Sequence, residues 1–250
     1  MGLNISIIKV KNALSRSGIY GVQYCLNPYR GCQHACKYCY AELIVRKTGK
    51  NDRWGSYVDI KDNFPEILER EVQRGRKGVV MVSSVTDPYQ PVEAKTFLTR
   101  KSLQILADNN FPVYILTKSP LVLRDIDIFR KFEEFEVGIT ITTDNEHVRK
   151  ILEPFAPSVE SRILAVKRLK KEGVKTSVFI GPILPMKPEN LLRSIENFVD
   201  CIYIDRMNYT FKVRSIYEKI GWKKFMDDEY FNNVLDFFRS RFENVINCME

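Results

Sequence analysis

The cysteines of the sequence divide into one cluster and three isolated positions. Three of the six, Cys32, Cys36 and Cys39, lie within eight residues and form a C-x3-C-x2-C motif. Clustered cysteines usually bind metal when a chain is not built on disulfides. A four-iron cubane is usually held by four thiolates. Because no fourth cysteine lies nearby, this spacing predicts a [4Fe–4S] cluster with one iron open to a substrate or cofactor.

A zinc ion is the competing ligand for this motif. His34 lies between the first two cysteines and would complete a Cys3His site. Structural zinc sites mostly use two short knuckles separated by a dozen or more residues, and the sequence contains no second knuckle. The iron–sulfur interpretation is therefore favoured, and His34 is expected to be a neighbour of the cluster.

The elements that must position this motif are short apolar runs alternating with segments of helical period. The runs predict strands at 21–26, 79–84, 113–117, 137–142, 175–180 and 201–205. The segments between them predict helices at 65–74, 95–109, 121–131, 158–172 and 189–198. Such alternation implies a parallel α/β fold. Six strands are too few to close the usual eight-stranded barrel, so we expect an open, partial (β/α)6 TIM-type barrel with its chemistry at the carboxyl ends of the strands.

A last amphipathic helix is predicted at 229–247. Its apolar stripe is formed by Phe231, Leu235, Phe238, Phe242 and Ile246. We expect this helix to cover the edge of the barrel. Residues 1–250 are then a single domain, with a core at about 20–207 and a helical cover at about 208–250.

Composition and charge limit the class of protein further. A chain of 250 residues with 44% hydrophobic content suits one large core. No run is apolar enough to span a membrane, and the N-terminus lacks the apolar core of a secretory signal, so we expect a cytoplasmic protein without a membrane partner. The net charge is +8, and residues 1–50 hold eight Lys or Arg against Glu42 alone. This segment either binds nucleic acid or balances an anionic cluster.

The cysteine motif also resembles that of a known family. With Tyr38 directly before Cys39, it is similar to the signature of the radical S-adenosylmethionine (SAM) superfamily. Further segments resemble the spore photoproduct lyase-like branch of that superfamily, over about residues 24–186. These segments are NPYRGC at 27–32, YCYA at 38–41, SVTDPYQPVE at 84–93, LTKS at 116–119, LRDI at 123–126 and LEP at 152–154.

The resemblance implies a radical enzyme with a [4Fe–4S] cluster and SAM as cofactors. SAM would chelate the open iron and be cleaved by one electron from a ferredoxin- or flavodoxin-like donor, giving a 5'-deoxyadenosyl radical that abstracts hydrogen from a substrate. A nucleic acid and a small molecule or peptide both remain open as substrates. The alternative is a nucleic-acid-binding protein with a structural zinc or iron–sulfur site and no turnover.

Tyr38 and Tyr40 flank the last cysteine of the motif and are the candidate catalytic residues. In the spore photoproduct lyases, which this chain resembles, the matching tyrosines are associated with the return of a hydrogen atom, together with a cysteine in the segment that here reads VSSV at 82–85. That cysteine is absent, so we do not expect lesion repair by the same route. Cys25 either substitutes for it or is buried packing.

The candidate cofactor-binding residues lie at the ends of predicted strands. Ser84, Thr86 and Asp87 stand where many relatives bind the methionine amino group, although Asp87-Pro88 also suits a simple β-turn. Lys118 matches the family's contact to the methionine carboxylate. Thr140 meets the ribose or satisfies backbone groups. Glu189, at the end of a proline-rich segment, contacts the adenosine portion of SAM or is only a helix N-terminal acid.

Overall fold

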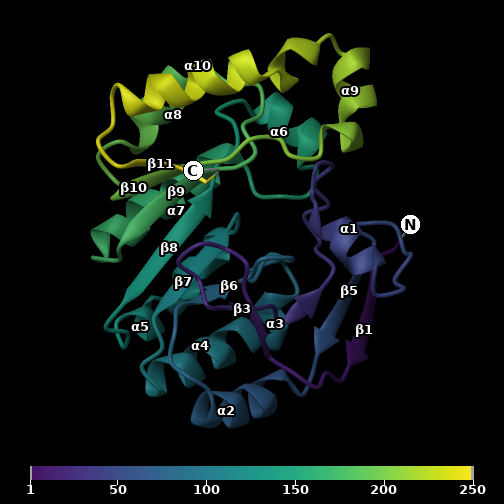
Figure 1. Cartoon of the computed structure of the whole chain (residues 1–250), viewed down its shortest axis with the longest axis vertical. Helices are drawn as coiled ribbons and strands as arrows, with labels where there is room; N and C mark the ends of the chain where they lie inside the picture. Colours follow the sequence, from purple (N-terminus) through teal and green to yellow (C-terminus); the bar gives the residue numbers. More distant parts are fainter. Residues whose placement is uncertain (1, 249–250) are drawn as a thin grey trace.

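The computed structural model describes residues 2–248 and contains a main sheet of eight strands (Figure 1). Their order is β11 (Val245–Asn247), β10 (Cys201–Ile204), β9 (Thr176–Ile180), β8 (Phe135–Thr140), β7 (Val113–Thr117), β6 (Val80–Val82), β3 (Tyr24–Leu26) and β2 (Leu14–Arg16). All neighbours pair in parallel except β2 and β3. Because β2 and β11 stand at opposite ends of this order, the sheet is a partial barrel, as predicted.

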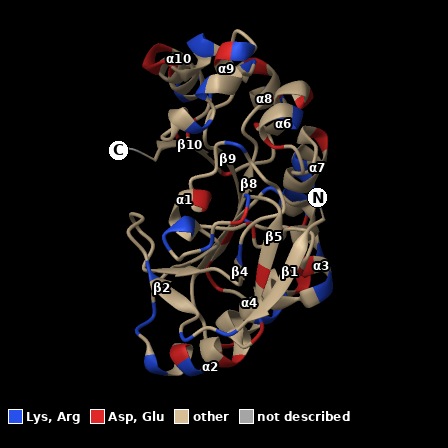
Figure 2. Ribbon diagram, turned by 90° about the vertical axis from the view of Figure 1, so that its right-hand side faces the viewer, with Lys and Arg blue, Asp and Glu red and all other residues tan. Residues whose placement is uncertain are grey.

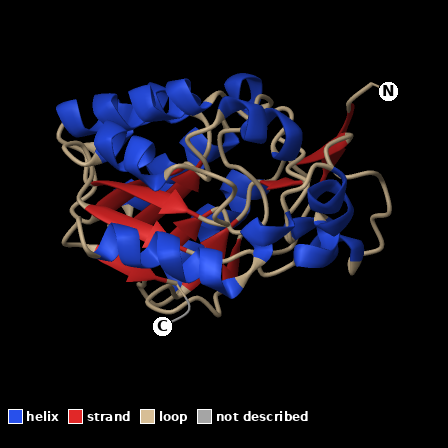
Figure 3. Cartoon of the chain, turned by 90° about the horizontal axis from the view of Figure 1, so that it is seen from above, coloured by secondary structure: helices blue, strands red, loops and turns tan. Residues whose placement is uncertain are grey.

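Helices connect the parallel strands, as the alternating pattern predicted. The α-helices are α1 (Ala41–Arg46), α2 (Phe64–Arg74), α3 (Glu93–Thr96), α4 (Leu98–Asp108), α5 (Ile126–Phe129), α6 (Glu146–Leu152), α7 (Val159–Lys171), α8 (Pro188–Ile195), α9 (Arg214–Lys219) and α10 (Asp228–Arg239). Seen from above, they flank the strands on two sides (Figure 3). Among residues 2–248, none of them has the length and apolar character needed to cross a membrane.

Side chains alternate between the two faces of the main sheet. Val137 and Ile139 of β8 belong to the large apolar core formed with the helices. Gly138 and Thr140 therefore face the inside of the barrel. A side chain at Gly138 would collide with the phenol of Tyr114 from the neighbouring β7, so this glycine makes room for an inward-facing tyrosine. The inner face of the barrel at β7 and β8 thus carries Gly138 and Thr140 beside Tyr114 and Leu116.

A small second sheet was not predicted. It has the order β1 (Asn4–Ile8), β5 (Tyr57–Lys61) and β4 (Tyr29–Arg30). Its central strand, β5, pairs in parallel with β1 and antiparallel with β4. Figure 1 shows it beside α1, away from α10. Because β4 directly precedes the cysteine motif, this sheet becomes part of the support of the motif.

Two predicted helices are interrupted. The helix expected at 95–109 is divided by Phe97, whose φ of 57° is left-handed, into α3 and α4. The carboxylate of Glu93 accepts the backbone N–H groups of Thr99 and Arg100 and thereby caps the start of α4. The helix expected at 121–131 begins as a 3-10 segment, Pro120–Asp125, and continues as α5.

The predicted C-terminal helix is wrong in its second half. Helix α10 ends at Arg239, and the chain then turns to form β11 beside β10. Phe231 and Phe238 are buried as expected, whereas Ile246 lies on β11 and is 46% exposed. The free edge of β10 explains the difference, because its backbone groups are satisfied by pairing with residues 245–247.

Candidate active site

The cysteine motif forms a loop between β4 and α1. Cys32 and Cys36 are buried, and Cys39 is half-buried directly before α1. The loop follows β3 and β4, so it lies at the carboxyl end of the first parallel strand, as the sequence predicted. This is the edge at which α/β folds place their chemistry.

Glycines allow the small sheet to approach this loop closely. Gly31 has a φ of +89°, and a Cβ there would lie 2.5 Å from the carbonyl oxygen of Tyr57. A Cβ at Gly55 would collide with Ala35, which lies within the motif. Residues 54–57 therefore pack directly against the cysteine loop.

Polar side chains of the SVTDPYQPVE segment fix the loop from the other side. The amide oxygen of Asn27 accepts the backbone N–H groups of Ser84 and Val85 at 3.0 Å each. Thr86 donates to the carbonyl of Gly31 at 2.6 Å, and the side chain of Gln90 accepts the N–H of Gln33 at 2.9 Å. The predicted residue Thr86 thus helps to hold the loop, whereas Ser84 is bonded to Asn27, which precedes β4.

The environment of the thiols disfavours free thiolates. Burial raises the pKa of Cys36 to about 12, while the nearby Lys118 acts in the opposite direction. Burial also raises the pKa of Cys32 and of Cys39. A buried thiol that is neutral on its own loses its proton when it binds a metal cation. The site therefore favours thiolates only in combination with a bound cation.

The donor set fits a cluster held by three thiolates. The other three cysteines lie on β3, at the start of β10 and after β11, outside the loop. Within residues 2–248, no group of three or more His, Cys, Asp or Glu is arranged to hold a metal ion. A single zinc ion needs such a group, whereas the thiolates of a cubane bind different irons. The arrangement gives no support to the Cys3His zinc site.

His34 has a different neighbour. It is buried, and its Nδ1 atom lies 3.4 Å from a carboxylate oxygen of Asp87. The same carboxylate accepts hydrogen bonds from Thr117 at 2.6 Å and from the backbone N–H of Lys118 at 2.8 Å. Burial alone would raise the pKa of Asp87, but His34 and these bonds hold it at about 2. Asp87 therefore links the loop after β6 to the end of β7.

A buried carboxylate, Glu153, lies behind Cys36. It accepts hydrogen bonds from Arg162 and Tyr38, and from Thr142 at 2.9 Å. Burial alone would raise the pKa of Glu153, but the charges of Arg162 and Lys118 outweigh it and hold the pKa at about 2. Two cations, Lys118 and Arg162, thus stand close to the cysteine loop. A negatively charged group in the loop would be stabilised by them.

Lys118 and Thr140 lie in the same region. The Nζ atom of Lys118 is 3.8 Å from Glu153 and 5.8 Å from the centre of the Tyr38 ring. Thr140 is buried at the end of β8. Glu189 is exposed on the first turn of α8, and no hydrogen bond or ion pair of the described chain joins it to the other candidates. The structure therefore does not bring Glu189 to the predicted site.

The two candidate tyrosines differ in access. Tyr38 is buried, and its hydroxyl donates a hydrogen bond to the carboxylate of Glu153. Tyr40 is 39% exposed, donates to the carbonyl oxygen of Ser84 and stacks on Tyr209 with ring centres 6.2 Å apart. Tyr209 in turn contacts Phe211 edge to face at 6.2 Å. These three side chains, called the aromatic row below, form an exposed apolar surface beginning next to Cys39.

Sequence reasoning missed several residues of this region. Glu153 lies in the LEP segment that contributed to the family resemblance, but no role was predicted for it. Arg162 and Trp54 carried no signal, because an arginine in an amphipathic helix reads as a surface charge. Trp54 is buried in the same apolar cluster as Cys32, and Arg162 is 1% exposed.

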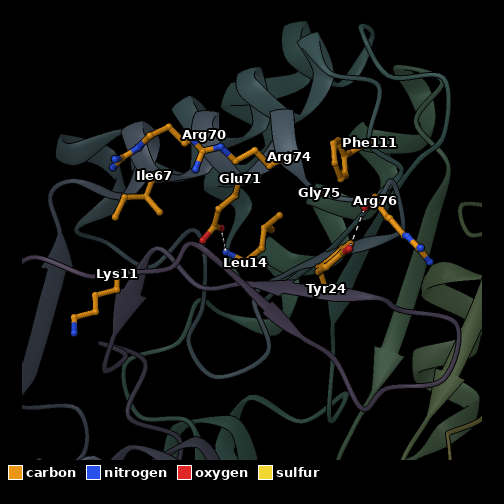
Figure 4. Close-up of a pocket in the computed structure, with 10 residues that line it drawn as sticks. All are labelled: Lys11, Leu14, Tyr24, Ile67, Arg70, Glu71, Arg74, Gly75, Arg76 and Phe111. Carbon is orange, nitrogen blue, oxygen red and sulfur yellow. Dashed lines mark hydrogen bonds between the residues drawn. The ribbon is translucent and has the colours of Figure 1, made fainter.

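Two cavities lie outside the cysteine loop and the residues that surround it. The larger, of about 440 Å³, is next to α2 and is lined by Lys11, Arg70, Arg74 and Arg76 among others (Figure 4). It contains none of the predicted site residues. The smaller, of about 330 Å³, lies beyond the ends of β9 and β10 and is lined by Arg206 and Asn208 among others.

The family model described as the radical SAM superfamily matches residues 26–199. An uncharacterized protein of Methanocaldococcus jannaschii is 40% identical over 212 residues, which are 83% of this chain and 80% of that protein. A Radical SAM Nalpha-GlyT isomerase of Pseudomonas phage M6 is 23% identical over 160 residues, 63% of this chain and 32% of that protein.

A solved structure resembles the fold over almost the whole chain. It is a spore photoproduct lyase mutant with bound SAM and a dinucleoside spore photoproduct. The TM-score is 0.70 at 13% sequence identity, and the match covers 98% of this chain and 81% of the other. At this identity the likeness concerns the fold.

Proposed function

The chain belongs to the radical SAM superfamily, and from this premise we propose that Cys32, Cys36 and Cys39 hold the [4Fe–4S] cluster that this superfamily uses together with SAM. The protein is thus a radical enzyme. When bound and reduced, the cluster supplies the electron that breaks the sulfonium C–S bond of SAM and so starts hydrogen abstraction from the substrate. One observation carries the ligand assignment: three buried or half-buried thiols share one loop, and no other cysteine of residues 2–248 lies in that loop.

The residues around the loop have two proposed tasks. Thr86 and Gln90 hold the backbone of the loop in place, and Asn27 holds the backbone of Ser84 and Val85 next to it, through the hydrogen bonds described above. Lys118, with its partner Glu153, supplies positive charge next to Cys36 and is the candidate for the carboxylate of SAM. Ser84, Asp87 and Thr140 are the remaining candidates for contacts to SAM.

Tyr40 is the better of the two tyrosines for chemistry on a substrate. Its ring is partly exposed next to Cys39, whereas Tyr38 is buried and bonded to Glu153. Burial raises the pKa of both hydroxyls, so each stays protonated at neutral pH. We assign Tyr38 to the support of Glu153 and Tyr40 to the substrate side.

For the substrate we propose a nucleic acid. The aromatic row offers planar side chains on which bases stack, and it begins directly beside the proposed cluster ligands. The solved spore photoproduct lyase structure contains a dinucleoside. The distribution of Lys and Arg does not indicate one binding face, because these residues are spread over the molecule from α2 past α1 to α9 in Figure 2.

Two further proposals complete this function. A ferredoxin- or flavodoxin-like protein supplies the electron, as the chemistry of the superfamily requires. The whole chain acts as one domain, because α10 packs on α8 and β11 extends the main sheet.

The test begins with anaerobic reconstitution with iron and sulfide. Dithionite-reduced protein incubated with SAM should release 5'-deoxyadenosine and methionine. Metal analysis should give about four irons with acid-labile sulfide per chain. An intact cluster without these products would favour the alternative, a binding protein with no turnover.

A further inference from the structure

One buried hydrogen-bond donor beside the cysteine loop has no acceptor. Trp54 is 8% exposed, and its indole Nε1 atom is buried with no hydrogen-bond partner in the described chain. A buried, unpaired N–H group costs about 1–3 kcal/mol. Native structures rarely keep such a group without a reason.

The position of Trp54 indicates where an acceptor belongs. Its neighbour Gly55 packs against Ala35, inside the cysteine motif, and Tyr57 packs against Gly31. Trp54 itself belongs to the apolar cluster that contains Cys32 and is contacted by Cys39. The segment that directly follows Trp54 is therefore held against the loop by two close contacts.

Within this apolar cluster, the cysteine sulfurs are the atoms whose strength as hydrogen-bond acceptors changes when a cluster binds. Among the other members of the cluster, Ala41, Val45 and Val85 have no polar side-chain atoms, and Tyr57 contacts Trp54 edge to face with ring centres 6.4 Å apart. A neutral thiol is a weak acceptor, but a thiolate on iron or a bridging sulfide carries negative charge and accepts strongly. The unpaired N–H is thus explained if the acceptor arrives with the cluster.

We propose that the indole N–H of Trp54 donates a hydrogen bond to a sulfur of the cluster and raises its reduction potential. The inference rests on the proposed function, since it needs a cluster on Cys32. Reduction adds negative charge to the sulfurs, so a donor stabilises the reduced form more than the oxidised one. Loss of the donor must shift the midpoint potential to a more negative value.

The experiment replaces Trp54 by benzothienylalanine, which keeps the ring shape and lacks the N–H. The reconstituted wild-type and variant proteins are titrated with dithionite under EPR. We expect an equal cluster content, a more negative midpoint in the variant, and the loss of one exchangeable proton coupling seen by ENDOR in deuterium oxide. Trp54→Phe should shift the potential in the same direction.

Two outcomes would overturn the inference. One is an unchanged midpoint and an unchanged exchangeable coupling in the benzothienylalanine variant at full cluster content. The other is a negative shift of the same size in Val45→Ala, which loosens the same apolar cluster without removing a donor. Absence of iron and sulfide from the wild-type protein would instead refute the proposed function, so the two failures are distinct.

Discussion

The ammonium group of Lys118 lies 3.8 Å from the carboxylate of Glu153, and both groups stand behind Cys36. Lys118 follows β7, whereas Glu153 follows α6 and is also bonded to Arg162 of α7. The carboxylate therefore joins three separate elements to the cysteine loop. It does so without contact with solvent, since Glu153 is 0% exposed.

Replacement of Glu153 by Gln should strongly destabilise the fold. The guanidinium of Arg162, 1% exposed, would lose its charged partner inside the protein. Breaking a buried pair in this way costs about 3–5 kcal/mol. Urea unfolding measures the effect. Glu172→Gln, which breaks partly exposed pairs with Arg130 and Arg168, should cost no more than about 1 kcal/mol and serves as the control.

The stabilisation by Glu153 should depend on pH. Its pKa is lowered from 4.5 to about 2 in the folded chain, so the unfolded chain takes up the proton first as the pH falls. The contribution is therefore complete above about pH 5 and is lost progressively as the pH falls toward 2. The difference in unfolding free energy between wild type and Glu153→Gln should shrink between pH 5 and pH 3. A constant difference over this range would contradict the low pKa.

Gly31→Ala should damage the cysteine loop more than Gly49→Ala. Both glycines have a positive φ, +89° and +83°, so both substitutions carry backbone strain of about 1–2 kcal/mol. Only at Gly31 would the new Cβ meet a backbone atom, the carbonyl oxygen of Tyr57; at Gly49 nothing lies within 4 Å. We expect reduced iron content after reconstitution for Gly31→Ala only. Equal iron content in both variants would show that the close approach is not required.

Phe211→Ala should weaken binding of a single-stranded oligonucleotide. Stacking of a base on an aromatic side chain contributes about 1–3 kcal/mol, so its loss corresponds to roughly a 5- to 150-fold increase in Kd. Tyr20→Ala is the matched control, because Tyr20 is fully exposed in the turn between β2 and β3, outside the aromatic row. Fluorescence anisotropy measures both. Equal losses, or none, would remove the support for a nucleic-acid substrate.

Sequence reasoning predicted the central architecture because the residues of the parallel strands are mostly apolar and are buried or half-buried. Such strands read as continuous apolar runs, and the run at 113–117 coincides with β7. The small sheet was missed since β1 is mostly exposed and β4 has two residues. The end of α10 was misplaced because residues 245–247 are determined by the free edge of β10 rather than by local preference.

The candidate site was predictable to the extent that residue type determines chemistry. Three clustered cysteines indicate a metal or iron–sulfur site. Lys118 follows a predicted strand whose carboxyl end lies at the same edge of the sheet as the cysteine loop. The Glu153–Arg162 pair and the unpaired Trp54 depend on how a loop, a helix and a second sheet meet in space. No local sequence pattern predicts these contacts between distant segments, and only the structure shows them.

The central claim is a cubane on Cys32, Cys36 and Cys39 with one iron free to bind SAM. Mössbauer spectroscopy of protein reconstituted with isotopically labelled iron tests it most directly. Addition of SAM should change the isomer shift of about one iron in four and leave the others as they were. Four equivalent, sulfur-coordinated irons that do not respond to SAM would show a fourth protein ligand and contradict the account.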